Sequence, residues 1–325
     1  MWKRLLCAAI LAHASCGVWA ASGTADTYPS KPIRMIVGFT PGGSDDYVGR
    51  VVGARITERF GQTVIVDNRP GAGGNLGAEI TARANPDGYT LSSVGSITLA
   101  SGPSLYPKLG FDLLKDFSYI SRVATGAQVL VAHPSIPAKS VSELVALARS
   151  QPKAIRYGSS GVASPSHLAV ELLQSRTGIE LVHVPYKGAA LSVIALTAGE
   201  VQILFASVTT AMPMIQAKRL NAVAVASAKR MGALPEVPTV AESGFPGFDM
   251  TYTYGILAPA GTPAAVVKLL HAELQKIVQM DDVKAKFAAQ GTEAVGSTPD
   301  EFRAIMQAEV VQWARVIKDA NITAN

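Results

Sequence analysis

Three short loops rich in glycine and serine are the parts of this sequence best suited to hold an anion. They are FTPGGSDD at 39–46, GSSGVAS at 158–164 and YKGAA at 186–190, and the first two each join a predicted strand to a predicted helix. Glycines let an anion approach the backbone, and the first N–H groups of a helix have no partner within it. Two such helix starts facing each other would hold a dicarboxylate by its two ends. For the first loop, the alternative is a structural turn in which Ser44 or Asp45 caps the helix.

Patterns typical of catalysis, nucleotides or metals do not emerge from the remaining residues. GSSG at 158–161 has the wrong spacing for a serine nucleophile elbow, and Leu76 stands where a dinucleotide fingerprint needs its third glycine. Adjacent Asp45 and Asp46 point apart on a helix and suit its N-terminal dipole better than acid–base catalysis. His167, one turn after Ser164, is a candidate polar ligand contact. The other mature histidines fit packing or surface positions: His133, His183 and His271. We expect no enzyme, no cofactor and no metal site.

The elements that must position these loops alternate between β-branched strands and amphipathic helices. Strands are predicted at 33–39, 63–66, 89–93, 128–133, 155–158, 181–185, 201–205, 220–227 and 251–258. Helices are predicted at 46–60, 75–84, 141–150, from 165, between the later strands, and at 262–280, 282–290 and 299–320. SVSE at 140–143 and TPDE at 298–301 have the spacing of capping boxes. This alternation predicts parallel sheets with helices on their faces.

The chain divides into two such units with no flexible linker between them, which suggests two α/β domains joined by extended strands. We predict that residues 27–128 and 245–325 form one domain and residues 129–244 the other, because the strands near 129–131 and 255–257 lie at the changes between units. The alternative is one continuous doubly wound sheet.

Composition indicates a well-packed globular chain. Of its 325 residues, 48% are hydrophobic and 16% charged, so two domains with real cores are expected and disorder is excluded. The net charge is +5. Lysine and arginine are scattered singly without interleaved aromatic residues, so nucleic acid is not an expected partner.

Residues 1–20 have the pattern of a signal peptide: Lys3 and Arg4, then an apolar run, then small residues at its end. A membrane anchor and a lipoprotein attached through Cys16 are the alternatives. Both cysteines, Cys7 and Cys16, lie in this leader, so the mature chain has no disulfide or thiol chemistry. The sequence therefore predicts an exported, soluble, periplasmic protein.

Eight motifs, in the order in which they occur, resemble the Bug family. This family, also called TctC, comprises the extracytoplasmic solute-binding proteins of tripartite tricarboxylate transporters. The motifs are YPSKPIR at 28–34, PGGSDD at 41–46, NRPGAGGN at 68–75, PDGYT at 86–90, YGSSG at 157–161, SPSHL at 164–168, VPYKG at 184–188 and LAPAGTP at 257–263. The resemblance covers essentially all of the mature chain. It implies an α/β fold of the type II periplasmic-binding-protein kind, with two α/β domains joined by crossover strands and a ligand cleft between them.

The resemblance also implies that backbone donors of the Pro-Gly-Gly loop grip one carboxylate of the ligand. The implied contacts from the first domain are Phe39, Thr40, Gly42, Gly43, Ser44 and Asp46, and those from the second are Ser159, Ser160, Ser164, His167, Tyr186 and Lys187. Gly43 is expected to need the backbone freedom of glycine as well as its lack of a side chain. The family often has an acid after the residue matching Phe205, where this chain has Ala206. Without that acid a ligand ammonium would lack its partner, which argues against an amino-acid ligand.

We therefore expect a non-catalytic periplasmic receptor that captures a small mono- or dicarboxylate and closes over it like a clam. The expected partners are that organic acid and the membrane permease of a tripartite tricarboxylate transporter, and the protein is expected to be a monomer. The alternative is a periplasmic sensor that presents its closed form to a signalling kinase. An exported hydrolase is disfavoured because no nucleophile–base pair is visible.

Overall fold

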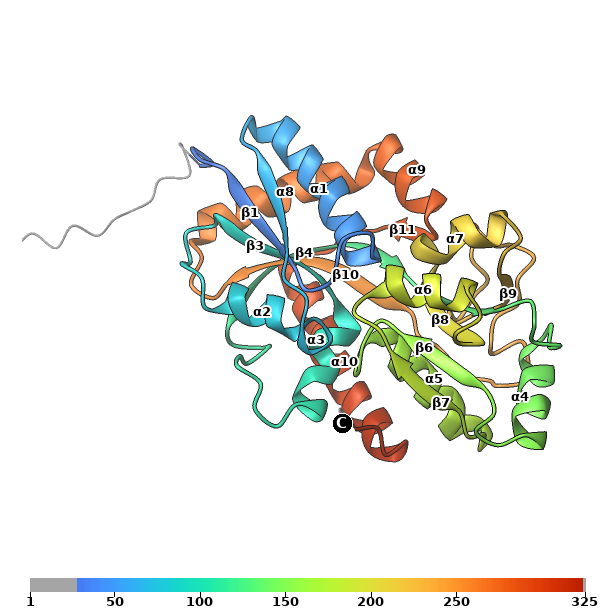
Figure 1. Ribbon diagram of the computed structural model, residues 1–325. Helices are drawn as coiled ribbons and strands as arrows, with labels where there is room; N and C mark the ends of the chain where they lie inside the picture. Colours follow the sequence, from blue (N-terminus) through green and yellow to red (C-terminus); the bar gives the residue numbers. More distant parts are fainter. Residues whose placement is uncertain (1–27, 324–325) are drawn as a thin grey trace, which may run out of the picture.

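A computed structural model describes residues 28–323 as two β-sheets with helices packed against them (Figure 1). The strands of the first sheet are β1 (Ile33–Val37), β2 (Val64–Asn68), β3 (Thr90–Gly95), β4 (Phe117–Gly126), β10 (Tyr252–Pro259) and β11 (Thr292–Ala294). Those of the second are β5 (Gln128–Ala132), β6 (Arg156–Ser159), β7 (Val182–Pro185), β8 (Ile203–Ser207) and β9 (Asn221–Val225). The predicted leader lies outside the described residues.

The helices follow the same division along the chain. Those that precede β4 or follow β10 are α1 (Ser44–Phe60), α2 (Asn75–Ala82), α3 (Ser96–Leu105), α8 (Ala264–Gln279), α9 (Asp281–Ala289) and α10 (Pro299–Asp319). Those between β5 and β9 are α4 (Val141–Ser150), α5 (Pro165–Thr177), α6 (Ala189–Thr197) and α7 (Val208–Gln216). Within residues 28–323, no helix combines the length and the apolar character that a membrane crossing needs.

Both sheets are mixed, which corrects the expectation of parallel sheets. The first has the order β11-β4-β10-β3-β1-β2, in which β1 pairs in parallel with β2 and β3 while β10 runs antiparallel to β3 and β4. The second has the order β7-β6-β8-β5-β9, with β6 parallel to β7 and β8 and with β5 antiparallel to β8 and β9. A helical crossover enforces a parallel pair. The strands that enter from the other sheet, β5 and β10, have no such crossover.

The chain passes twice between the two sheets. Only Ala127 separates β4 from β5, and residues 226–251 lead from β9 back to β10. In Figure 1 the blue and orange-red segments form one lobe, and the green and yellow segments form the other. The alternative of one continuous sheet is therefore wrong. The exact division into residues 27–128 with 245–325 and 129–244 stays a prediction.

Helix ends follow the local sequence signals. The helix α1 ends where Gly61 adopts a left-handed conformation and its N–H donates to the carbonyl of Thr57. The capping box that opens α10 is confirmed, because Thr298 and Glu301 exchange both hydrogen bonds. The box predicted at α4 is only half formed: Ser140 Oγ accepts from the N–H of Glu143, but the Glu143 carboxylate accepts from the N–H of Lys139.

Three elements were not predicted from the sequence: β4, α3 and β11. Polar residues interrupt β4, which is nevertheless buried along most of its length. The helix α3 contains Gly102 and Pro103, which are poor helix formers, but it is almost entirely buried. Packing decides the structure of both segments against their local preferences.

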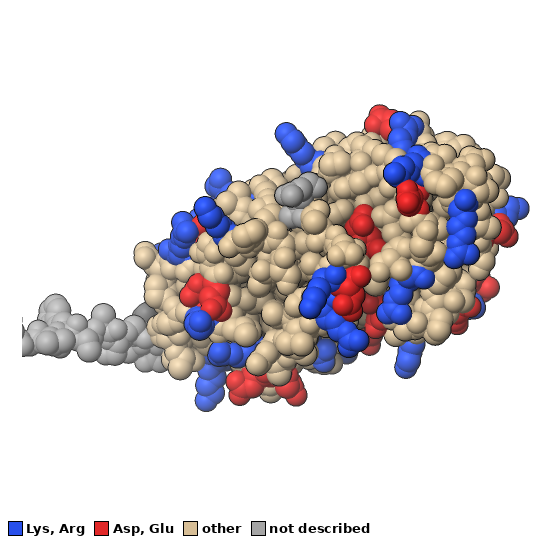
Figure 2. Space-filling view, turned by 90° about the horizontal axis from the view of Figure 1, so that it is seen from below, with Lys and Arg blue, Asp and Glu red and all other residues tan. Residues whose placement is uncertain are grey.

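The surface carries no continuous basic patch on the face shown in Figure 2. Lysine and arginine lie interspersed there with aspartate and glutamate over a largely uncharged surface. This distribution is what the scattered basic residues of the sequence predict.

Candidate functional site

A cavity of about 40 Å³ lies between the two sheets, with room for a few water molecules. One side is formed by the β1–α1 loop, the start of α3 and β10. The other side is formed by β5, the β6–α5 loop, α6 and β8. Its lining residues are Phe39, Thr40, Gly43, Ser44, Asp45, Gly95, Ile97, Thr98, Gln128, Ser160, Pro165, Ser166, Ala189, Ser192, Phe205, Ala206, Ser207 and Tyr252.

The β1–α1 loop presents its backbone to this cavity. The first hydrogen bond of α1 is donated by Tyr47 to the carbonyl of Gly43 (2.9 Å), so the N–H groups of residues 44–46 have no acceptor within the helix. The strained conformation belongs to Gly42 (φ 85°), whereas Gly43 has an ordinary φ of −79°. The expectation that Gly43 needs glycine's backbone freedom is therefore wrong. A Cβ at Gly43 would contact only the carbonyl of Thr40, at 3.7 Å.

Asp46 holds this loop from behind. Its carboxylate accepts from the N–H of Gly42, the side-chain amide of Asn68 and the guanidinium of Arg50, each at 2.9 Å. The same amide of Asn68 also donates to the carbonyl of Phe39. Burial alone would raise the pKa of Asp46, but the bonds from Arg50, Gly42 and Asn68 hold it below its ordinary value. Asp46 therefore stays ionised and positions the loop.

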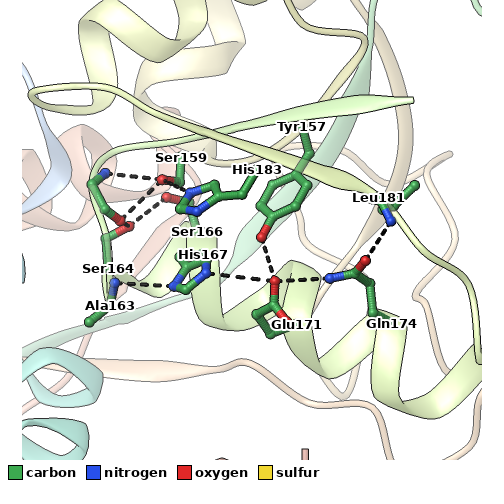
Figure 3. Close-up of polar contacts among 11 residues, drawn as sticks. Tyr157, Ser159, Ala163, Ser164, Ser166, His167, Glu171, Gln174, Leu181 and His183 are labelled. Carbon is green, nitrogen blue, oxygen red and sulfur yellow. Dashed lines mark hydrogen bonds and ion pairs between the residues drawn. The ribbon is translucent and has the colours of Figure 1, made fainter. Parts of the chain in front are cut away.

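The β6–α5 loop is built from serines that bond to one another (Figure 3). The N–H of Ser160 donates to Ser166 Oγ at 2.8 Å, and both residues line the cavity. Ser164 Oγ donates to the carbonyl of Gly161, and Ser159 Oγ lies 2.7 Å from His183 Nε2. All four hydroxyls are thus engaged within the protein, since Ser166 Oγ also lies 3.1 Å from Ser160 Oγ and 2.9 Å from Ser164 Oγ; of the four residues, Ser160 and Ser166 line the cavity.

Two histidines stack beneath this loop instead of facing a ligand. The rings of His167 and His183 lie 4.2 Å apart, and that of Tyr157 continues the stack (Figure 3). His167 Nδ1 accepts from the N–H of Ala163 at 3.1 Å. Burial lowers the pKa of His167 to about 3, with repulsion from His183 adding to the shift, and burial lowers that of His183 to about 4. Both rings are therefore neutral supports of the loop.

Two further loops meet across the cavity's edge. Gly188, at φ 118°, lies so close to Thr40 that a Cβ there would collide with the threonine side chain. Gly73 lies against the opposite lobe, where a Cβ would be 3.2 Å from the carbonyl oxygen of Val162. The two lobes therefore already touch at both of these places, which describes a closed cleft.

Five of the predicted contacts line the cavity: Phe39, Thr40, Gly43, Ser44 and Ser160. Seven lie outside its lining: Gly42, Asp46, Ser159, Ser164, His167, Tyr186 and Lys187. Tyr186 bonds through its hydroxyl to Glu200, and Lys187 is exposed.

Several cavity-lining residues were not predicted from the sequence. They come from β10, β5, the β3–α3 junction and the helix starts after β6 and β8. Gly95 and Ser207 each end a strand and precede a helix, and that position was a usable signal. Nothing local marks Tyr252 or Gln128, because each faces the cavity only through the crossing of the two sheets.

Asp45 is the one lining residue with an acidic side chain. Burial raises the pKa of Asp45 to about 7. The N–H groups of Asp45 and Gly95 have the opposite effect, because they favour the ionised carboxylate. Close by, Thr98 is 4% exposed and its Oγ1 has no hydrogen-bond partner. In the part of the chain that the structure describes, no group of three or more His, Cys, Asp or Glu residues could hold a metal ion.

Two α/β lobes, crossed twice by the chain and enclosing a cavity between them, define a two-domain solute-binding protein of the periplasmic-binding-protein class. The chain belongs to the TctC family: residues 48–322 match the family described as tripartite tricarboxylate transporter family receptor. Such receptors bind solutes and are not enzymes.

Relatives of known sequence or structure agree with this assignment. The chain is 37% identical over 317 residues to Protein BugT of Bordetella pertussis (strain Tohama I), covering 97% of each chain. Its fold is similar to that of Rpa4515 of R. palustris with adipate, at 32% identity and a TM-score of 0.88 over 91% of this chain and 99% of that one. It is also similar to MatC of Rhodopseudomonas palustris with bound malate, at 28% identity and a TM-score of 0.85 over 89% and 100%.

Proposed function

We propose that this protein is a periplasmic receptor that captures a small mono- or dicarboxylate and delivers it to the membrane permease of a tripartite tricarboxylate transporter. The observation that supports this most is the β1–α1 loop, where Gly43 and Ser44 line the cavity at a helix start whose N–H groups lack helical acceptors. The positive end of the helix dipole favours an anion at the same place. The signal-peptide pattern of residues 1–20 supports the periplasmic location.

The chemistry of the cavity suits a carboxylate without requiring a cation. None of its lining residues is lysine or arginine, and the serine hydroxyls of the lining bond within the protein, as Ser192 does to the carbonyl of Ala189. The donors left for a ligand are the backbone N–H groups at the start of α1. A hydrogen bond to a charged group contributes about 1.5–3 kcal/mol. About four such donors approach the roughly 8 kcal/mol of a micromolar complex after ordering costs. Rpa4515 was solved with adipate and MatC with malate, which are both dicarboxylates.

In this proposal the ligand enters when the lobes part at Ala127 and residues 226–251, and it is held when they close. Phe39, Thr40, Gly43, Ser44 and Ser160 contact the ligand. Gly42, Asp46, Ser159, Ser164 and His167 position the two ligand loops, while Tyr186 and Lys187 border the mouth of the cleft.

Calorimetry on Gly43→Ala tests backbone capture. Gly43 has an ordinary φ and its Cβ would meet only the carbonyl of Thr40, so alanine should keep the fold while placing a methyl group where the ligand must touch the chain. A thermal-shift screen of organic acids, adipate and malate included, identifies the acid for the measurement. We expect affinity for that acid to fall about tenfold or more.

Gly232→Ala is the matched control, because a Cβ there would meet nothing within 4 Å and Gly232 does not line the cavity. We expect it to bind like wild type, after circular dichroism shows that both variants fold. Wild-type affinity in Gly43→Ala would refute backbone capture, and the absence of binding to every acid in the screen would refute the proposed function.

A further inference from the structure

The cavity contains one acidic group and no basic side chain to balance it. Asp45 follows the two residues assigned to carboxylate capture, Gly43 and Ser44, and lines the same cavity; its Oδ1 lies beside Gly95, another lining residue. Asp45 is half-buried and lines both this cavity and a smaller pocket beside it. Lys187, the basic residue expected near the ligand, lies outside this lining and is exposed. A bound ligand therefore meets a carboxyl group that no lysine or arginine of the lining neutralises.

The surroundings of Asp45 act on its charge in both directions. The N–H groups of Asp45 and Gly95 both favour its ionised form, as does its place in the first turn of α1. Asp46 is the nearest charge, but it is paired with Arg50 at 2.9 Å. The other titratable groups that face Asp45 are the hydroxyls of Tyr252 and Tyr254, which bond to each other. Desolvation and repulsion from Asp46 oppose the negative charge, and a cation in the cavity would offset that cost.

The charge of the ligand decides whether it fits this arrangement. A simple dicarboxylate brings two more negative charges beside Asp45, with only hydroxyls and amides to receive them. A ligand with one carboxylate and one protonated nitrogen places the carboxylate at the start of α1 and the nitrogen on Asp45. The Oγ1 of Thr98, buried and unpartnered, is one further group in the lining available to such a ligand.

We propose that Asp45 selects ligands that carry a protonated nitrogen in addition to the carboxylate. This proposal rests on the proposed function, since it assumes carboxylate capture at Gly43 and Ser44. It also reverses the expectation drawn from Ala206: the acid missing from β8 is replaced by one that enters the cavity from the opposite lobe.

The test compares pairs of acids that differ only in the amine: aspartate with succinate, glutamate with glutarate, and 4-aminobutanoate with butanoate. Calorimetry at pH 8 should show the amino member of the best pair binding to wild type about tenfold or more tightly than its partner. In Asp45→Asn, a change that keeps the size of the side chain, the preference should vanish while the affinity for the simple acid stays equal or rises. Affinity of wild type for the amino member should fall as the pH drops from 8 to 6, because Asp45 takes up a proton.

The control variants separate this proposal from the function on which it rests. Asp45→Asn with an unchanged preference, or wild-type affinity for the amino member that does not fall between pH 8 and 6, overturns the proposal. In either case, the proposed function as a carboxylate receptor still holds if Gly43→Ala loses binding and Gly232→Ala does not. If no member of any pair binds and the wider acid screen is also empty, both the proposal and the proposed function fail.

Discussion

Replacing Gly73 with leucine should weaken ligand binding, because Gly73 lies where one lobe touches the other. Its backbone has φ 63° and ψ 16°. A Cβ there would lie 3.2 Å from the carbonyl oxygen of Val162 and 3.4 Å from that of Ala163, so the rest of a leucine side chain forces the loops apart. Overpacking of this kind costs about 1–3 kcal/mol. In the proposed function the closed form holds the ligand, so the dissociation constant should rise about five- to 150-fold.

Gly178→Leu provides the control for backbone strain. Gly178 has φ 68° and ψ 20°, nearly the same conformation, but a Cβ there would meet nothing within 4 Å. A non-glycine residue in this region costs about 1–2 kcal/mol, so both variants should lose similar stability in urea.

Calorimetry with the tightest acid from the screen, and X-ray scattering at saturating acid, make the comparison. We expect Gly178→Leu to bind like wild type and Gly73→Leu to bind weakly and remain more extended. Wild-type affinity in Gly73→Leu, or an equal loss in Gly178→Leu, would refute the reasoning that closure brings these loops together.

Three other changes probe the parts of the site that do not line the cavity. Lys187→Gln should change the affinity for the ligand by no more than about twofold, and mainly at low salt, because the side chain is exposed. Calorimetry at two ionic strengths checks this, and a tenfold loss of affinity would contradict it. Asp46→Asn should lower the free energy of unfolding by about 1–3 kcal/mol, because a neutral amide cannot accept all the hydrogen bonds that Gly42, Arg50 and Asn68 donate to the carboxylate. An unchanged midpoint of urea unfolding would show that these hydrogen bonds are unimportant for stability. The pKa of His167 is lowered to about 3 and that of His183 to about 4 in the folded protein. Below pH 6.5 the unfolded chain therefore binds more protons than the folded protein does, and the free energy of unfolding falls as the pH drops. The fall is at most about 1.4 kcal/mol per pH unit for each ring. Urea unfolding at pH 7.5 and 5 should therefore show a smaller acid loss in His167→Gln than in wild type, and parallel losses would rule out this origin.

The part of the fold visible in the sequence is the part built from local signals. The β1–α1 unit was predictable because an apolar run is followed by a glycine turn and a helix that ends at Gly61. The direction of β10 was not, since a buried strand has the same composition whether its neighbours run parallel or antiparallel. The helix α3 was missed because Gly102 and Pro103 argue against a helix that only tertiary packing justifies.

The same distinction applies to the residues of the candidate site. Gly43, Ser44 and Ser160 were predictable because each belongs to a loop between a strand and a helix. Tyr252 and Gln128 were not, because they reach the cavity from strands that cross between lobes. Asp45 was placed correctly at the helix start, but sequence alone could not show that its side chain faces the cavity.

The position of β10 in the first sheet also dictates an order of folding. It lies between β3 and β4, pairing with both, yet the entire second sheet separates it from them along the chain. While the chain is synthesised from its N-terminus, β3 and β4 therefore cannot complete their sheet until the residues of β10 have followed. The second lobe is continuous in sequence and can form first, whereas the first lobe closes through long-range contacts, the kind that slow folding.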